Sequence, residues 1–521
     1  MQKEYKADVV ILGGSLGGCA SALASARMGK KVILTEETGW IGGQLTSQAV
    51  PPDENRWIEQ FGCTRSYRQL RDGIRSYYRE HLPLTWQARN TYHLNPGNGG
   101  VSRLCHDPRV AVAVLKEAMA PYTLSGRLIL WNHHKIRKVD TEGDRVRAAV
   151  VQNLETGEEK VLHASYFLDA TECGDVLPLA GAEYVTGSES KKETGELHAL
   201  DGEADPLDMQ SITWCFAMDY LEGEDHTIDK PEQYEFWKNY RCDFWPGSLL
   251  SWTTCHPVTL ERRENTLFPV DQRNSLWNYR KITDHTNFAP DLFESDVTLV
   301  NWPQNDYWLG PVYEVEETEI KRNLKGARQL SLSFLYWMQT EAPGPDGGIG
   351  YPGLRLRPDV VGTEDGLAMY PYIRESRRII SEFPILEQYV SPAMRGDKAA
   401  EKFEDTVGIG HYRMDLHPST GGRNYIDNSA HPFQIPLGSL IPVRMENLLP
   451  ACKNIGTTHV TNGAYRLHPV EWNIGEAAGL LAAYALDHHT TPRAVRNEKE
   501  ELADFQKLLF SQGIELDWPK I

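Results

Sequence analysis

The residues of this 521-residue chain that could most plainly do chemistry are a cluster of glycines near its start. LGGSLGG, residues 12–18, follows the apolar run DVVI and precedes a segment rich in alanine and serine. A glycine-rich turn between a strand and a helix presents backbone amides at the positive end of the helix dipole, where phosphate groups bind. The stretch therefore predicts a site for the diphosphate of a dinucleotide.

One position of this loop departs from the dinucleotide fingerprint G-x-G-x-x-G. Gly13 and Gly18 occupy the first and third glycine positions, but Ser15 stands at the second, where the backbone normally approaches the diphosphate. Serine is small, and its hydroxyl can donate to a phosphate oxygen, so we expect the loop to keep its ligand. The predicted loop comprises Gly13, Gly14, Ser15, Leu16, Gly17 and Gly18.

An acidic residue follows at the place where this fingerprint requires one. Glu36 ends the apolar run at residues 31–35, about twenty residues beyond the loop, and Glu37 comes next. A carboxylate there accepts hydrogen bonds from ribose hydroxyls and repels a 2′-phosphate, which disfavours NADP. The alternative for the loop is a glycine-rich turn that binds no ligand, and the alternative for Glu36 is a solvated surface carboxylate. The combination of strand, loop, helix and acid favours dinucleotide binding.

Three later segments, in this order along the chain, carry a family resemblance. They are EETGWIGGQLTSQ at 36–48, YFLDATECGD at 166–175 and NGAYRLHPVEWNIGEAAG at 462–479. With the loop, they resemble the FAD-dependent oxidoreductases that have the glutathione-reductase type of flavin fold, and more closely a bacterial branch of that family. The resemblance spans nearly the whole chain. It implies FAD as the cofactor and an α/β fold, with a Rossmann-like FAD-binding domain and a mixed α+β substrate domain.

The resemblance also implies roles for individual residues. Glu36, with Glu37 beside it, holds the adenosine ribose, and Lys135 or Ile136 offers backbone to the adenine. Gly42, Gly43 and Gln44 run beside the isoalloxazine. Ala170, Thr171 and Asp175 lie near the diphosphate, in a stretch where Glu172 replaces a family glycine. Gly475, Ala477 and Ala478 open the last long helix, whose N-terminus faces the pyrimidine edge of the flavin.

The residues just before that helix are the predicted catalytic group. Oxidation by a flavin needs a base for the proton that accompanies the hydride. His468 is the predicted base because imidazole titrates near neutral pH, with Glu471 as its partner and Asn473 to orient the substrate. A structural histidine is the alternative for His468. His459 is the second candidate base, and His417 and His431 are weaker candidates that are more typical of loops.

The elements that must position these residues follow from apolar patterning. Runs at 8–12 and 31–35 predict buried parallel strands around a helix at 17–28, for which Gly29 is the cap. Further predicted elements are a helix starting at Asp107-Pro108, β-hairpins over 127–162, strands at 166–170 and 447–450, and a helix at 475–486. The predicted domains are 1–186 and 406–521, which together bind FAD, and a substrate domain at 187–405.

Aromatic and basic residues mark the predicted substrate domain. Eight of the 14 tryptophans fall between Trp214 and Trp337. They could line a carbohydrate cleft or fill a domain core; the candidates are Trp237, Trp245, Trp252, Trp302 and Trp308. A basic run could clamp an anion or form ion pairs; it contains Arg374, Arg377 and Arg378.

Composition excludes several other classes of protein. The formal net charge of −18 and the lack of a long basic run argue against nucleic-acid binding. No apolar stretch is long enough for a membrane span, and no signal peptide is recognisable. The eight cysteines form no CxxC pair, which argues against a metal site or a redox disulfide and favours a reducing, cytoplasmic location. The sequence leaves a homo-oligomer open.

Together these features predict an FAD-dependent oxidoreductase, either an oxidase or a dehydrogenase. We expect hydride transfer from a CH–OH group of a small, carbohydrate-like substrate to flavin N5. The alternatives are an amine or CH–CH oxidoreductase and a flavoprotein that uses FAD without redox chemistry.

Overall fold

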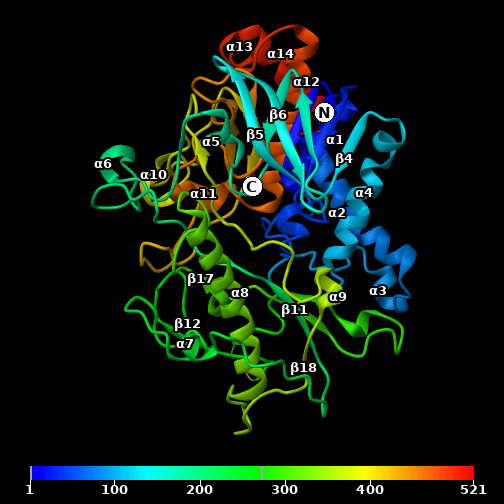
Figure 1. Ribbon diagram of the computed structural model, residues 1–521, viewed down its shortest axis with the longest axis vertical. Coiled ribbons are helices and arrows are strands. Elements are labelled where there is room, and N and C mark those ends of the chain that lie inside the picture. Colours follow the sequence, from blue (N-terminus) through cyan, green and yellow to red (C-terminus); the bar gives the residue numbers. More distant parts are fainter. Residues whose placement is uncertain (1–2, 271–273, 521) are drawn as a thin grey trace.

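The computed structural model describes residues 3–270 and 274–520. Figure 1 shows two regions along the long axis of the molecule. One contains the first and the last described residues, and in it α1 (Leu16–Arg27) and α12 (His468–His488) lie beside β4 (Leu128–Trp131), β5 (His134–Glu142) and β6 (Arg145–Asn153). The other is built around α8 (Glu317–Thr340). This arrangement puts residues from the start and the end of the chain into one region.

A five-stranded parallel sheet forms the centre of the first region. Its order is β24 (Leu448–Pro450), β8 (Tyr166–Asp169), β2 (Val9–Leu12), β3 (Val32–Thr35) and β4 (Leu128–Trp131). Every residue of β2, β3 and β8 is buried, as expected for parallel strands covered on both faces. The prediction of β-hairpins over 127–162 is wrong for β4, which pairs in parallel with β3 and does not belong to a hairpin. A strand from residues 448–450 thus completes the sheet begun at residue 9.

Small residues bring α1 and α12 into close contact. A Cβ atom on Gly475 would lie only 2.0 Å from the carbonyl oxygen of Gly17, so glycine is required at this crossing. The hydroxyl of Ser21 donates to the carbonyl of Gly475 at 2.7 Å, and that of Ser25 donates to Gly479 at 3.1 Å. The alanine- and serine-rich composition of both helices therefore serves their mutual packing.

The start of α12 differs from the prediction. The helix begins at His468, seven residues before Gly475, because Pro469 suits the first turn of a helix. Gly475, Ala477 and Ala478 accordingly lie in the helix interior and do not open it.

Other elements of this region agree with the sequence patterns. Asp107 caps α4 (Pro108–Leu124) by accepting from the amide of Arg109, and Gly29 adopts the left-handed conformation after α1. A four-stranded sheet has the order β1 (Lys3–Lys6), β7 (Glu159–His163), β6 (Arg145–Asn153) and β5 (His134–Glu142). Further helices of the chain are α2 (Arg65–His81), α3 (Trp86–Asn90), α5 (Val176–Ala180), α11 (His459–Tyr465), α13 (Pro492–Asn497) and α14 (Lys499–Gln512).

The second region has its own core. α8, which the weak periodicity of this segment did not predict, packs with a sheet of order β15 (Lys281–Thr283), β16 (Val297–Val300), β11 (Phe216–Tyr220) and β18 (Leu354–Leu356). The five candidate tryptophans are all buried in this core, with at most 7% of each residue exposed. The core-filling alternative therefore holds for these rings.

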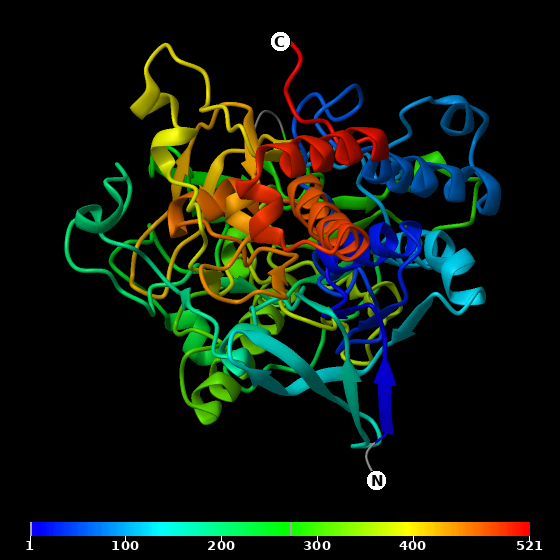
Figure 2. The same ribbon diagram turned by 90° about the horizontal axis from the view of Figure 1, so that it is seen from above.

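Seen from above, α12 and α14 lie in front of most other elements, and the N-terminal strand points away from them (Figure 2). Within residues 3–270 and 274–520, no helix combines the length and apolar composition that crossing a bilayer requires.

Candidate functional site

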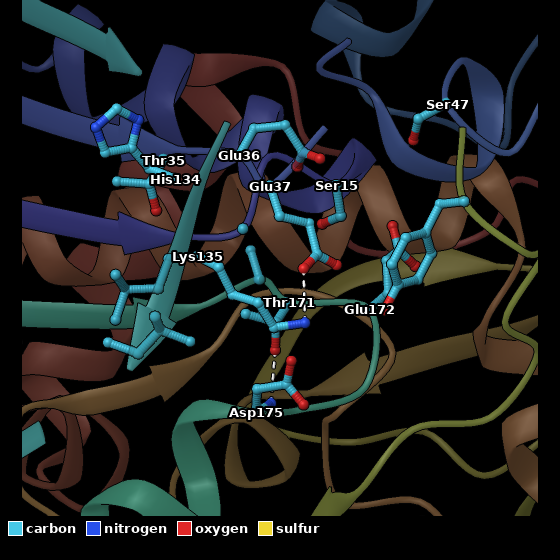
Figure 3. A pocket seen from close by; sticks show the side chains of 15 residues that line it. Ser15, Thr35, Glu36, Glu37, Ser47, His134, Lys135, Thr171, Glu172 and Asp175 are labelled. Carbon is cyan, nitrogen blue, oxygen red and sulfur yellow. Dashed lines mark hydrogen bonds and ion pairs between the residues drawn. The ribbon is translucent and has the colours of Figure 1, made fainter. Parts of the chain in front are cut away.

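A cavity lies at the carboxyl ends of the parallel strands. In open α/β sheets, ligands bind at this edge. We call it the cofactor cavity. Figure 3 shows that its side chains come from the glycine loop, the end of β3, β5 and the segment after β8. Eight predicted cofactor residues line it: Gly13, Ser15, Glu36, Glu37, Lys135, Ala170, Thr171 and Asp175.

The geometry of the glycine loop explains why serine is accepted at its middle position. Ser15 has a φ of −57°, which any L-residue adopts, whereas Gly13 has a φ of +99°. A Cβ atom on Gly13 would also lie 2.3 Å from the carbonyl oxygen of Ala170. The Ser15 hydroxyl accepts from the amide of Gly18 at 3.1 Å, so Ser15 is the N-cap of α1. The first glycine is therefore obligatory and the second is not.

Two amides of the loop remain available to a ligand. Gly14 donates to Glu36 and Gly17 donates to Glu471, whereas the amides of Ser15 and Leu16 have no hydrogen-bond partner among the described residues. Both lie at the positive end of α1. Free amides at a helix N-terminus bind anions, so this end of the cavity suits the diphosphate of FAD.

We expect Ser15→Ala to lower stability without removing the cofactor. The substitution deletes the N-cap of α1 but leaves the backbone amides in place, at a cost of about 1 kcal/mol. Thermal unfolding of the apoprotein should show a melting temperature a few degrees lower, while FAD content stays near that of the wild type. Ser15→Gly should retain more of the stability, because glycine is a tolerated cap. Loss of FAD from both folded variants would contradict this role.

Glu36 is placed to meet a ribose. Its Oε2 accepts from the amide of Gly14 at 2.8 Å, and its Oε1 accepts from the amide and the hydroxyl of Thr38 at 2.8 and 2.7 Å. Burial raises the pKa of Glu36 to about 7, against the opposing effect of these hydrogen bonds. The carboxyl group is therefore easily protonated before a ligand arrives.

This raised pKa predicts that FAD affinity depends on pH. Ribose hydroxyls donate to the ionised carboxylate, so FAD binding should favour ionisation and strengthen as pH rises through about 7. The stability of the apoprotein should change with pH in the opposite direction. The contribution associated with the raised pKa of Glu36 is fully present below the pKa of the unfolded state and is lost as pH rises through the pKa of the folded state. Titration of apoprotein with FAD at pH 6 and pH 8 measures the first effect. In Glu36→Gln the difference should vanish, whereas in Glu37→Gln it should remain.

Lys135 reaches the cavity with its side chain. Its Nζ lies 2.7 Å from Oε2 of Glu37, the ion pair drawn in Figure 3. Burial lowers the pKa of Lys135, but Glu37 outweighs it and the net pKa lies above the ordinary value. Thr171, on the opposite wall, accepts from the amide of Asp175 at 2.7 Å. The cavity thus has charged groups near Glu36 and a short polar turn after β8.

Two glycines of the segment predicted beside the isoalloxazine have left-handed backbone conformations. Gly42 and Gly43 both have positive φ values, of 109° and 50°. Gly42 donates its amide to the carbonyl of Gly14 at 2.7 Å, which joins this segment to the glycine loop. Gln44 donates to the carbonyl of Arg466 at 3.1 Å and also to Glu471. None of these three residues lines the cofactor cavity itself.

Glu172, the departure from the family pattern, belongs to a buried charged cluster. Lys453 forms an ion pair with Glu172, and its Nζ lies 3.9 Å from Glu471. Glu471 also accepts from the amide of Gly17 at 3.0 Å and from the thiol of Cys452 at 3.2 Å. Lys453 therefore neutralises the glutamate that replaces the glycine.

The geometry favours the structural alternative for His468. Its Nδ1 accepts from the amide of Asp53 at 3.0 Å, and its Nε2 lies 3.2 Å from the carbonyl of Val50. Burial lowers its pKa to about 3, so the ring is neutral with both nitrogens engaged by backbone. Glu471 makes no hydrogen bond to it among the described residues.

The remaining predicted residues also lie outside the cofactor cavity. Asn473 is buried and donates to the carbonyl of Val407 at 3.1 Å. Gly475, Ala477 and Ala478 are buried within α12, and none lines the cavity. The second candidate base, His459, is fully engaged: its Nδ1 contacts Glu375 at 2.9 Å and its Nε2 contacts Arg423 at 2.9 Å.

A second and larger cavity is lined by residues of the region around α8 and by residues 412–427, which follow that region in the chain. We call it the substrate cavity. Its lining is polar and aromatic and includes Tyr279, Arg280, Asn301, Tyr412, Asp415, His417 and Tyr425. Arg466 connects this cavity to the segment predicted beside the isoalloxazine: its carbonyl accepts from Gln44, and its guanidinium lies 3.4 Å from Asp415.

His417 is the one histidine on the wall of this cavity among the described residues. Its Nδ1 lies 2.6 Å from Oδ2 of Asp306, which is fully buried at the start of β17 (Asp306–Tyr307). Burial disfavours the ionised form of Asp306, but Arg374 and His417 outweigh it and the net pKa is lowered. An ionised Asp306 fixes the proton of His417 on Nδ1. This leaves Nε2, which lies 3.8 Å from Oδ2 of Asp415, as the acceptor.

Sequence reasoning gave His417 little weight and did not find Arg280, Asn301 or Asp306. His417 is more than 100 positions from the other three residues in the chain, and the fold alone brings it to them. The only local signal was LHPST, residues 416–420, which places a histidine directly after a short strand. The basic run at 374–378 forms ion pairs instead of a clamp, since Arg374, Arg377 and Arg378 are matched by Asp306, Asp175 and Glu375.

One comparison with known proteins identifies the family of this chain. The model of the FAD dependent oxidoreductase family matches residues 8–509. No curated protein matches the chain. Among solved structures, it is similar to p-nitrophenol 4-monooxygenase PnpA from Pseudomonas putida DLL-E4, with 11% identity, 99% of this chain and 88% of that chain covered, and a TM-score of 0.37.

Two further solved structures show similarities that are weaker by TM-score. A geranylgeranyl bacteriochlorophyll reductase-like protein from Thermoplasma acidophilum has 11% identity, 98% and 85% coverage, and a TM-score of 0.32. L-proline dehydrogenase from P. horikoshii has 14% identity over 36% of this chain, at a TM-score of 0.19, and the match spans only 25% of that protein. At these scores the likenesses support no argument about substrate. The family match, which covers most of the chain, shows that this protein belongs to the FAD-dependent oxidoreductases and is an enzyme with FAD as its cofactor and an FAD-binding α/β fold.

Proposed function

We propose that this enzyme oxidises a CH–OH group of a small, carbohydrate-like molecule bound in the substrate cavity. The observation that carries the proposal is the pairing of His417 with Asp306 on the cavity wall, at 2.6 Å. When an alcohol is oxidised, its carbon loses a hydride, which is two electrons and one proton. Its oxygen loses a second proton. The hydride needs an oxidant and the second proton needs a base.

The chain's own residues would divide these tasks as follows. Ser15 and Leu16 amides and Glu36 would hold FAD by its diphosphate and ribose. FAD, when bound, would supply the two-electron oxidant for the hydride. Nε2 of His417 takes the hydroxyl proton, and Asp306 stabilises the imidazolium that results. Tyr279, Tyr412 and Tyr425 provide aromatic faces and hydroxyls for a polyhydroxylated molecule.

We also propose the glutathione-reductase type for the FAD-binding part, assembled from 1–186 and 406–521, with 187–405 as the substrate domain. The parallel pairing of β24 with β8 supports this division, because it joins residues 448–450 to the N-terminal sheet. The free state of all eight cysteines is in keeping with a cytoplasmic enzyme.

Anaerobic mixing of the FAD-loaded enzyme with small molecules tests the reaction class. We expect polyols, sugars or hydroxy acids to bleach the absorption of oxidised FAD, and amines of similar size to leave it unchanged. Bleaching by amines alone would favour an amine oxidoreductase. Reduction by neither class, with FAD tightly bound, would favour CH–CH or non-redox chemistry and would overturn the proposal.

A further inference from the structure

Arg280 is a buried cation with unused hydrogen-bond donors in the substrate cavity. Only 7% of it is exposed, and its Nε and Nη1 have no partner among the described residues. Its nearest carboxylate is Asp53, 3.6 Å from Nη2, beyond ordinary hydrogen-bond distance. Buried donors are nearly always satisfied, so unused ones on a cavity wall point to a ligand that accepts hydrogen bonds.

Two neighbouring groups on the same wall also have donors to spare. Asn301, 5% exposed, accepts at Oδ1 from Nη2 of Arg374 at 3.3 Å, which leaves its Nδ2 without a partner. The hydroxyl of Tyr425 likewise has no partner among the described residues. Its ring lies 5.3 Å from that of His417, which places this hydroxyl-bearing side chain beside the proposed base. The donors therefore belong to the wall that contains His417.

The carboxylates on this wall are already engaged by other cations. Asp427 accepts from Arg413, and Asp415 lies 3.4 Å from Arg466. Among the described charged residues of the wall, Arg280 is thus a buried cation with N–H donors that have no hydrogen-bond partner. A neutral ligand would leave this guanidinium desolvated and incompletely paired, whereas an anion would form charge-assisted hydrogen bonds with it.

We propose that the substrate of this enzyme is a monocarboxylic acid of the sugar-acid or hydroxy-acid class, and that Arg280 and Asn301 bind its carboxylate. This inference rests on the proposed function for the oxidised group and adds the anion. A single incompletely paired guanidinium matches a monoanion better than a phosphate dianion. Arg280 has the role of a specificity residue, while His417 handles the proton of the hydroxyl that is oxidised.

Paired probes of similar size, one acidic and one neutral, separate carboxylate binding from alcohol oxidation. We would compare glucuronate with glucose, gluconate with glucitol, and lactate with propane-1,2-diol, using the FAD-loaded full-length enzyme. The readouts are the shift in melting temperature on probe binding and the rate of anaerobic flavin bleaching. The inference predicts that at least one acid binds and bleaches the flavin about 100-fold more efficiently than its neutral partner.

Variants at Arg280 test the assignment of the residue. Arg280→Met should reduce the efficiency with the acid about 100-fold and leave the neutral partner little changed. Arg280→Lys should retain an intermediate preference, and the exposed Arg241→Met should behave as wild type. If Arg280→Met fails to fold, the wild-type comparison and Arg280→Lys still decide.

Each outcome has one meaning. Neutral probes that bleach the flavin as well as their acids would overturn the carboxylate inference and leave alcohol oxidation standing. Acids that bind through Arg280 without bleaching would overturn alcohol oxidation and support the anion site. A preference for glucose 6-phosphate over glucuronate would overturn the monoanion assignment.

Discussion

Replacing Gly14 with leucine is expected to abolish FAD binding in a protein that still folds. A Cβ atom there would lie 2.8 Å from Cβ of Glu36 and 2.9 Å from its Oε2, so the carboxylate must move away from the ribose position. Gly14 has no positive φ, and the substitution therefore adds no backbone strain. Loss of two hydrogen bonds to a charged group costs about 3 kcal/mol or more, which is over 100-fold in affinity.

The measurement is the FAD content of the purified variant, followed by titration of its apoprotein with FAD. Gly202→Leu is the matched control, because that glycine has open space around it and no positive φ. It should bind FAD as the wild type does. A Gly14→Leu variant that retains full FAD content would show that the cofactor cavity does not bind the dinucleotide in this way.

Replacing His417 with glutamine is expected to slow flavin reduction about 100-fold to 10,000-fold, the usual contribution of a general base. The variant should keep its FAD, since His417 lines the substrate cavity and not the cofactor cavity. Rapid anaerobic mixing with a reducing substrate gives the rate. His285→Gln is the matched control: His285 has the same arrangement, with Nδ1 2.7 Å from Asp296, but lies outside the substrate cavity.

His468 provides the contrast with His417. His468→Gln should lower the melting temperature, since it disturbs hydrogen bonds to buried backbone at Val50 and Asp53. Its rate of flavin reduction per bound FAD should change far less than that of His417→Gln. The reverse result, a stable and inactive His468 variant beside an active His417 variant, would return the role of base to His468.

The sequence was most informative where local patterns determine structure. The glycine loop, the acid after β3 and the short apolar runs predicted the nucleotide-binding edge, because strand, turn and helix N-terminus are adjacent in the chain. The start of α12 was misplaced, since its small residues Gly475, Ala477 and Ala478 reflect packing, not a helix end. Local composition does not distinguish these two causes.

The substrate cavity lay beyond the reach of local patterns. Arg280 and Asn301 lie in the segment with weak periodicity, whereas His417 follows the strand β21 (Met414–Leu416) beyond that segment. Only the tertiary fold brings the three residues onto one wall. The tryptophans that suggested a carbohydrate cleft turned out to fill the core next to α8. Aromatic content thus indicated the larger core of this region but not the position of its cavity.

A single-turnover experiment without oxygen tests the central claim most directly. The FAD-loaded enzyme is mixed with a limiting amount of a hydroxy acid that bleaches it, and the product is identified. We predict one carbonyl product for each FAD reduced, with the new C=O at the carbon that carried the hydroxyl group. Bleached flavin with an imine or an alkene as the product, or a carbonyl formed while the flavin stays oxidised, would contradict the account.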